Sequence, residues 1–307
     1  MAQETLAGVF TPVLTPFDKA LNVDTDLFVK FCSWIVTQGA GLAVFGTTSE
    51  ANSLTVAEKL ELLAHLIEAE VPAEKLIPGT GACALPDAVA LCEAAAKAKT
   101  AAVLMLPPFY YKSLSEDGLF AFYSEAIQRV GDAALKICLY HIPQMSGVPM
   151  TLSFIERMLK AYPATVIGIK DSGGDFANSK AMLEAFPDFR VFSGSDRFLL
   201  DNLRSGGAGC ISAMGNVHPG AIVNLYETRN SPEADAKQNA LNQMRTLYEK
   251  VAMIPALKRT VAEYGRTPSF RMVRPPLTEL SDQDWAGLKT NLSDLALKTP
   301  NLDKILA

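Results

Sequence analysis

Short apolar runs alternate along the chain with longer stretches in which apolar residues recur at helical spacing. Within each run most consecutive positions are apolar, which is typical of strands that are buried on both faces of a parallel sheet. We expect eight strands, at Gly8–Leu14, Gly41–Phe45, Lys75–Gly79, Ala101–Leu106, Leu135–Tyr140, Val166–Lys170, Arg190–Ser193 and Gly209–Ser212.

The stretches between these runs predict helices. Thr55 and Glu58 form a capping box in front of apolar positions at helical spacing, so a helix should begin there. Further helices are expected at Pro86–Lys99, Ser115–Arg129 and from Thr151 onward. Eight such units in about 220 residues favour a closed (β/α)8 TIM barrel, which typically needs about 250 residues. An open doubly wound sheet is the alternative, but no G-x-G-x-x-G follows the first run.

Beyond about Pro219 the pattern is helical only. We therefore predict a (β/α)8 barrel over residues 1–225, carrying the active site, and a small C-terminal helical appendage over residues 226–307. No low-complexity linker separates the two parts.

Composition narrows the function classes. The 307 residues carry a net charge of −5 with a pI near 5.4, so no basic surface for nucleic acid is expected. No apolar run approaches the roughly 18 residues that span a bilayer, and the start lacks the features of a secretory signal. We expect a cytoplasmic protein. Three histidines lack metal-ligand spacing, and five cysteines lack a C-x-x-C pair, so we expect no metal and buried, reduced thiols.

Polar residues gather where the predicted strands end, and in (β/α)8 barrels those ends form the active site. They lie in Gly46–Glu50, Pro107–Tyr111, Tyr140–Pro143, Lys170, Ser193–Arg197 and Ser212. The resulting pocket would hold a lysine, tyrosines, hydroxyls and glycine-exposed amides, with no histidine triad and no paired carboxylates. This set suits imine chemistry on a small anionic keto acid.

Lys170 ends the apolar run that starts at Val166. Burial disfavours the charged form of an amine, and the neutral amine is the nucleophile of Schiff-base chemistry. Alternatively, Lys170 extends from the strand end into solvent and pairs with Asp171.

Each of the other strand ends also has a structural interpretation. Gly46-Thr47-Thr48 could be no more than a turn that caps the next helix. Tyr140 could be a core aromatic, and Tyr110-Tyr111 could be an interface patch. For His141 and Asp171 a structural role is favoured outright. Taken together at six strand ends, the remaining residues favour a site.

Five motifs occur in the order of a known family. They are Gly46-Thr47-Thr48-Ser49-Glu50, Tyr110-Tyr111, Tyr140-x-x-Pro143, Gly168-x-Lys170-Asp171-Ser172 and Ser193-Gly194-x-Asp196. From about Gly8 to Ser212 the chain resembles the dihydrodipicolinate synthase/N-acetylneuraminate lyase family of pyruvate-dependent class I aldolases. A helical C-terminal part is also typical of that family.

The resemblance implies roles for individual residues. Lys170 matches the Schiff-base lysine, so the covalent imine would replace any cofactor. Tyr140 matches the tyrosine that relays protons, and Thr47 and Thr48 match the pair that holds the pyruvate carboxylate and joins the relay. Tyr111 matches a tyrosine that reaches a neighbouring subunit's site across a tight dimer. The family is mostly a dimer of dimers, so we expect a homotetramer.

Strands seven and eight supply the remaining candidates for substrate binding. Ile211 matches a residue whose backbone contacts the keto acid, and Gly194 and Ser212 lie beside it on the predicted rim. We expect Asp196 and Arg197 to read the distal end of the substrate. Arg197 could instead be a solvated residue in the first turn of a helix.

Departures from the family pattern bear on the substrate. Met145 stands where the synthase branch has an arginine that grips a dicarboxylate semialdehyde, and a thioether cannot form that bidentate pair. Dihydrodipicolinate synthesis is therefore disfavoured. Arg197 replaces an acidic residue of the sialate lyase branch, and Ser49 replaces a commoner glycine. We expect a 2-keto-3-deoxy sugar acid or a related keto acid as substrate.

Two further functions stay open. A keto-acid dehydratase would use the same imine and eliminate water. A non-catalytic, keto-acid-binding regulatory barrel would have lost turnover, although an intact set of Lys170, Tyr140 and Thr48 argues against such loss. A phosphate-binding barrel is disfavoured, because no glycine-rich phosphate loop follows strand seven.

Overall fold

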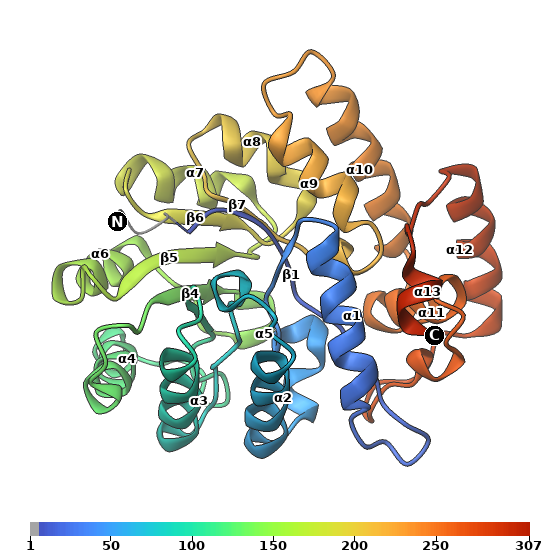
Figure 1. The fold of residues 1–307 in the computed structure, drawn as a ribbon. Helices are drawn as coiled ribbons and strands as arrows, with labels where there is room; N and C mark the ends of the chain where they lie inside the picture. The colour runs from blue at the N-terminus through green and yellow to red at the C-terminus, as the bar shows by residue number, and fades with distance from the viewer. Residues whose placement is uncertain (1–5) are drawn as a thin grey trace.

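The computed structural model describes residues 6–307, and its centre is a sheet of seven parallel strands (Figure 1). The strands are β1 (Gly8–Thr11), β2 (Gly41–Leu42), β3 (Val103–Met105), β4 (Ile137–His141), β5 (Val166–Asp171), β6 (Arg190–Ser193) and β7 (Gly209–Ile211). Their spatial order is β2-β1-β7-β6-β5-β4-β3. All seven coincide with predicted runs.

The remaining run, predicted as a strand over Lys75–Gly79, closes the ring between β2 and β3. It makes parallel bridges from Leu76 to Leu42 and from Gly79 to Leu104. Pro78 has no N–H to donate, so the ladder is interrupted there, although its carbonyl accepts from Leu104 N at 2.9 Å. The prediction of a (β/α)8 barrel is confirmed, with one strand reduced to isolated bridges.

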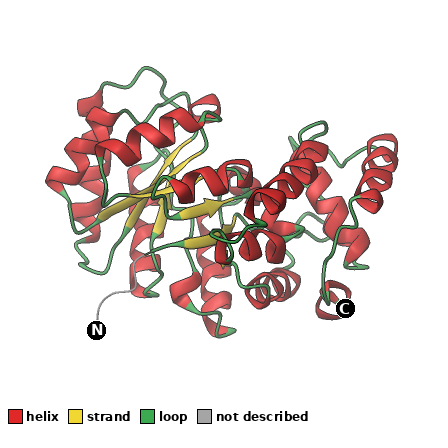
Figure 2. Ribbon diagram, turned by 90° about the horizontal axis from the view of Figure 1, so that it is seen from above, coloured by secondary structure: helices red, strands yellow, loops and turns green. Residues whose placement is uncertain are grey.

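Helices surround the sheet (Figure 2). They are α1 (Thr25–Thr37), α2 (Val56–Glu68), α3 (Leu85–Lys97), α4 (Glu116–Val130), α5 (Pro143–Ser146), α6 (Leu152–Ala161), α7 (Phe176–Ala185), α8 (Leu199–Arg204), α9 (Pro219–Glu227), α10 (Ala234–Tyr248), α11 (Met253–Tyr264), α12 (Asp282–Asp294) and α13 (Leu302–Leu306). The predicted capping box opens α2, since Thr55 accepts from Glu58 N at 3.1 Å. The predicted helices α3, α4 and α6 also form.

The C-terminal helices α10 to α13 lie beside the barrel, next to α1 (Figure 1). One apolar core runs through both parts, because residues of α1 and α2 pack in the same cluster as residues of α10 to α13. Trp34 of α1 donates its indole N–H to the Pro300 carbonyl at 2.9 Å. The predicted boundary after residue 225 falls in the last turn of α9, and the division into two parts stays a prediction.

Four of the five cysteines are buried and free, as expected, whereas Cys83 is exposed. The prediction was wrong for Cys83 because it lies in the irregular segment before α3 rather than on a packed element. Within residues 6–307, no helix combines the length and the apolar character that crossing a membrane requires.

Candidate active site

Lys170 and Tyr140 face each other across neighbouring strands. The register of β5 and β4 pairs the two residues, and each is only 4% exposed. Lys170 Nζ donates to the Tyr140 hydroxyl at 3.3 Å and lies 4.3 Å from the centroid of the tyrosine ring. Lys170 is therefore neither in solvent nor paired with Asp171. Its buried amine points at a phenol.

Thr47 extends this contact to a third element. Its hydroxyl lies 3.2 Å from the Tyr140 hydroxyl, and either oxygen can be the donor. An amine, a phenol and an aliphatic hydroxyl thus form a continuous chain from β5 through β4 to the turn after β2. Such a chain can carry a proton to or from a group bound at the amine.

The turn that holds Thr47 is the 3-10 turn η1 (Thr47–Ser49). The backbone hydrogen bonds of this turn come from the N–H groups of Ser49, Glu50 and Ala51. Within the described chain the N–H groups of Thr47 and Thr48 have no acceptor, so they can bind another group. The Ser49 hydroxyl accepts from Gly46 N at 3.2 Å. This serine, which stands where the family more often has a glycine, therefore caps the start of the turn. Thr48 is half-buried beside Thr47.

The backbone on both sides of η1 is left-handed, with φ of 60° at Phe45 and 57° at Glu50. A residue other than glycine in this region costs about 1–3 kcal/mol and persists only where its surroundings hold it. Glu50 is held by two bonds, from Lys258 Nζ at 2.6 Å and from Arg274 N at 2.9 Å.

Lys258, which pairs with Glu50, was not predicted as a site residue from the sequence. Burial lowers its pKa to about 8, although the attraction of Glu50 opposes that shift. One signal was present in the sequence: Ile254, Lys258 and Val261 follow each other at helical spacing, so the lysine occupies a core position of α11.

His141 and Asp171 have structural roles, as expected. His141 Nδ1 accepts from Met150 N at 3.0 Å, and burial lowers the histidine pKa. Asp171 accepts from Gly173 N at 2.9 Å and from the Ser179 hydroxyl at 2.7 Å, so it orders the start of the segment that leads into α7.

Asp196 and Arg197 are already engaged by α10. The fully buried Asp196 accepts from the Ser212 hydroxyl at 2.7 Å and from Arg245 at 3.0 Å. Arg197 donates to Glu249 at 2.5 Å. Helix α10 packs against the end of β6 and pairs with both residues, while Oδ2 of Asp196 has no partner in the described chain. That the two residues read a substrate stays a prediction. Ser212 serves the same network.

Gly194 and Ile211 lie at the ends of β6 and β7. Gly194 N donates to the Asp171 carbonyl at 2.7 Å, and a Cβ at this position would collide with Ser172. Ile211 is fully buried in the apolar cluster that also contains Tyr140. Gly194 therefore lies next to the strand that carries Lys170, whereas Ile211 lies one strand further away, on β7.

Tyr111 and Met145 are exposed, whereas Lys170 and Tyr140 are buried. Tyr111 is 70% exposed, and Met145, on the short helix α5, is 63% exposed. These are large apolar surfaces to leave in water, and within residues 6–307 neither belongs to an apolar core cluster.

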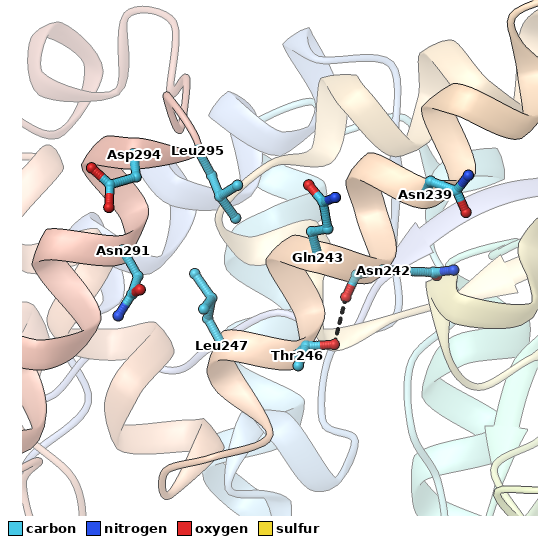
Figure 3. A pocket seen from close by; sticks show the side chains of 8 residues that line it. All are labelled: Asn239, Asn242, Gln243, Thr246, Leu247, Asn291, Asp294 and Leu295. Atoms are coloured by element: carbon cyan, nitrogen blue, oxygen red, sulfur yellow. Dashed lines mark hydrogen bonds between the residues drawn. The ribbon is translucent and has the colours of Figure 1, made fainter.

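A groove of about 550 Å³ lies between α10 and α12 (Figure 3). Figure 3 shows its lining, which is mostly amide and hydroxyl side chains: Asn239, Asn242, Gln243, Thr246, Leu247, Asn291, Asp294 and Leu295. It contains none of the residues predicted for the site. Across residues 6–307, no three His, Cys, Asp or Glu side chains are grouped so as to hold a metal ion.

Comparisons with known proteins show which family the chain is related to. Residues 5–295 match the Dihydrodipicolinate synthetase family. An uncharacterized DapA-like lyase of Chloroflexus aurantiacus is 33% identical over 285 residues, covering 92% of this chain and 94% of that protein. The 4-hydroxy-tetrahydrodipicolinate synthase of Pseudomonas aeruginosa is 30% identical over 282 residues, covering 90% and 94%.

Among solved structures, the fold is similar to that of YagE, a prophage protein of the dihydrodipicolinic acid synthase family from E. coli K12, in complex with pyruvate. The TM-score is 0.86 at 26% identity, covering 95% of this chain and 99% of that one.

Barrel, site and relatives together define a lyase. The chain belongs to the Dihydrodipicolinate synthetase family.

Proposed function

We propose that this protein is a class I aldolase that forms an imine between Lys170 and pyruvate or another 2-keto acid. The single observation that carries the proposal is the buried chain from Lys170 through Tyr140 to Thr47. The amine of Lys170 is buried, faces the hydroxyl of Tyr140 and has no carboxylate partner in the described chain, so it is placed to act as a nucleophile on a bound carbonyl carbon. The pyruvate complex of the similar YagE protein supports the same assignment.

The chemistry follows from these three groups. The amine of Lys170 attacks the C2 carbonyl carbon, and the carbinolamine loses one water to give an iminium. Cleavage of the C3–C4 bond sends its electron pair to the iminium nitrogen and yields an enamine. Tyr140 takes the proton from the C4 hydroxyl as the aldehyde leaves and returns a proton to C3. In the condensation direction the same proton moves back.

The turn after β2 binds the carboxylate of the keto acid in this proposal. The N–H groups of Thr47 and Thr48, which have no acceptor in the described chain, supply donors for the anion. Thr48 adds a hydroxyl, and the backbone at Ile211, on β7, supplies the further contact that the family resemblance implies. This arrangement orients C2 toward the lysine.

A 2-keto-3-deoxy sugar acid or a related keto acid is the substrate class that we propose. Met145 is exposed on α5 and cannot make a bidentate pair with a second carboxylate, which disfavours aspartate semialdehyde. We also propose a homotetramer, because Tyr111 is 70% exposed in one subunit and would be covered in a neighbour's site.

Borohydride trapping tests the imine. Native protein is incubated with pyruvate and borohydride, digested, and analysed by peptide mass. The reduced pyruvyl group should appear on the peptide that contains Lys170. An unmodified protein, or modification at another lysine, would overturn the proposal, and pyruvate binding without an adduct would favour the non-catalytic barrel.

A substrate panel then separates the reactions. We expect turnover of 2-keto-3-deoxy sugar acids in preference to N-acetylneuraminate and aspartate semialdehyde, with release of pyruvate. A product that retains its whole carbon skeleton would instead identify a dehydratase.

A further inference from the structure

Glu50 directly follows the turn that carries Thr47 and Thr48, and its buried carboxylate accepts from two residues of the C-terminal region. Its side chain and that of Lys258 are both 0% exposed and form an ion pair at 2.6 Å. Glu50 has a left-handed backbone and joins the turn η1 to a second 3-10 turn, η2 (Ala51–Ser53). The conformation of this residue therefore sets where the preceding turn lies.

A second cation supports the same segment. Arg274 donates its backbone N–H to the other oxygen of Glu50 at 2.9 Å, and its guanidinium donates to the Ser53 carbonyl at 2.8 Å. Lys258 Nζ lies 4.3 Å from the ring centroid of Phe17, and the Arg274 guanidinium lies 4.6 Å from it. Two residues of the C-terminal region, Lys258 and Arg274, thus contact the segment from Glu50 to Ser53.

Stability alone is a weak reason for such a pair. Taking two charges out of water is costly, and apolar residues of similar volume often stabilise a protein equally well. A pair of this kind is better suited to selecting one geometry. Here the geometry in question is a strained backbone directly beside the amides of Thr47 and Thr48.

We propose that Glu50 and Lys258 are positioning residues, whose buried ion pair holds the Thr47–Thr48 turn in the conformation that binds the substrate carboxylate. Helix α11 then takes part in the active site without touching the substrate. This inference rests on the proposed function, because it assigns the carboxylate to that turn.

The experiment measures how much pyruvate half-saturates borohydride trapping at Lys170. Glu50→Gln and the double variant Glu50→Gln/Lys258→Met remove the ion pair while keeping side-chain size. Lys59→Met is the matched control, because Lys59 is also buried but lies on α2. Half-saturation is compared among variants that urea unfolding shows to be fully folded, because an unfolded fraction would itself raise the apparent value. Among these variants a merely structural role would leave it unchanged.

We expect the half-saturating pyruvate concentration to rise about tenfold or more in Glu50→Gln and in the double variant, and to stay near the wild-type value in Lys59→Met. Folded variants that bind pyruvate like the wild type would overturn the inference. If the wild-type protein forms no adduct at Lys170, the result would instead count against the proposed function.

Hydrogen exchange of the native protein decides the matter if neither variant folds. Pyruvate should slow amide exchange in residues 253–264 as well as in residues 46–54, since the pair connects the two segments. Slowing that is confined to residues 46–54 would overturn the inference.

Discussion

Two buried lysines in this barrel have opposite surroundings. Lys170 faces the hydroxyl of Tyr140, whereas Lys258 faces the carboxylate of Glu50. The carboxylate of Glu50 holds the amine of Lys258 in a buried ion pair, so this lysine has a structural role. The amine of Lys170 has no carboxylate partner in the described chain and points at a phenol, so it is placed to attack a carbonyl carbon. The partner of a buried lysine, more than its burial, indicates what the lysine does.

The largest expected effect separates the two lysines directly. Lys170→Met should remove the borohydride adduct and lower turnover by about 10³-fold or more, because the variant lacks the amine of the proposed imine. Trapping and steady-state kinetics measure both. Lys258→Met should still form the adduct at high pyruvate. The comparison fails if Lys170→Met retains the adduct or if Lys258→Met alone loses it.

Tyr140→Phe tests the hydroxyl that faces Lys170. The aromatic ring stays, but the proton path to Thr47 is broken, so kcat should fall by about 10²- to 10⁴-fold. The adduct with pyruvate should still form, which separates proton transfer from imine formation. Unchanged kcat would show that another group carries the proton.

Lys258→Met should lower the free energy of unfolding by about 3–5 kcal/mol, because it leaves the carboxylate of Glu50 buried without a partner. Removing both charges, in Glu50→Gln/Lys258→Met, should cost clearly less. Urea unfolding of the two variants and the wild type provides the numbers. Equal losses in the single and double variants would mean that the charges are not coupled.

Glu58 supplies a pH-dependent test in the same region. Hydrogen bonds from Arg274 lower the pKa of Glu58 from 4.5 to about 2. The folded state thus favours the carboxylate, so the stabilisation is complete above pH 4.5 and is lost as the pH falls toward 2. The advantage of the wild type over Glu58→Gln in urea unfolding should shrink across this window. A constant difference would contradict the pairing.

Arg197→Ala should have the smallest effect. The Arg197–Glu249 pair is partly exposed, at 34% and 39% of the two side chains. Such pairs contribute about 0–1 kcal/mol, and kcat/KM on the best substrate should not change. A large loss of kcat/KM would support the sequence-based prediction that Arg197 reads the substrate.

The barrel and its lysine cluster could be predicted from the sequence for one physical reason. Buried parallel strands are apolar at most positions, and their carboxyl ends meet at one edge. Lys170, Tyr140 and Thr47 therefore come together although they are far apart in the chain. Pro78 explains the one reduced strand, since it cannot donate to a neighbour.

The contacts of the other site residues depend on how helices far away in the chain pack against the barrel. Local sequence patterns do not indicate that packing. Asp196 lies at a strand end like Lys170, yet its partner Arg245 comes 49 residues later, on α10. Glu50 and Lys258 are separated by 208 positions. The direction of a side chain at the barrel rim is decided by such partners, and a strand-end position alone does not reveal them.

The ion pair beneath the turn has a practical consequence for chimeric enzymes. A library that grafts the C-terminal helices of one relative onto the barrel of another would need to inherit positions 50 and 258 from the same parent. Hybrids that mix the two would be expected to keep the reactive lysine and still bind keto acids poorly.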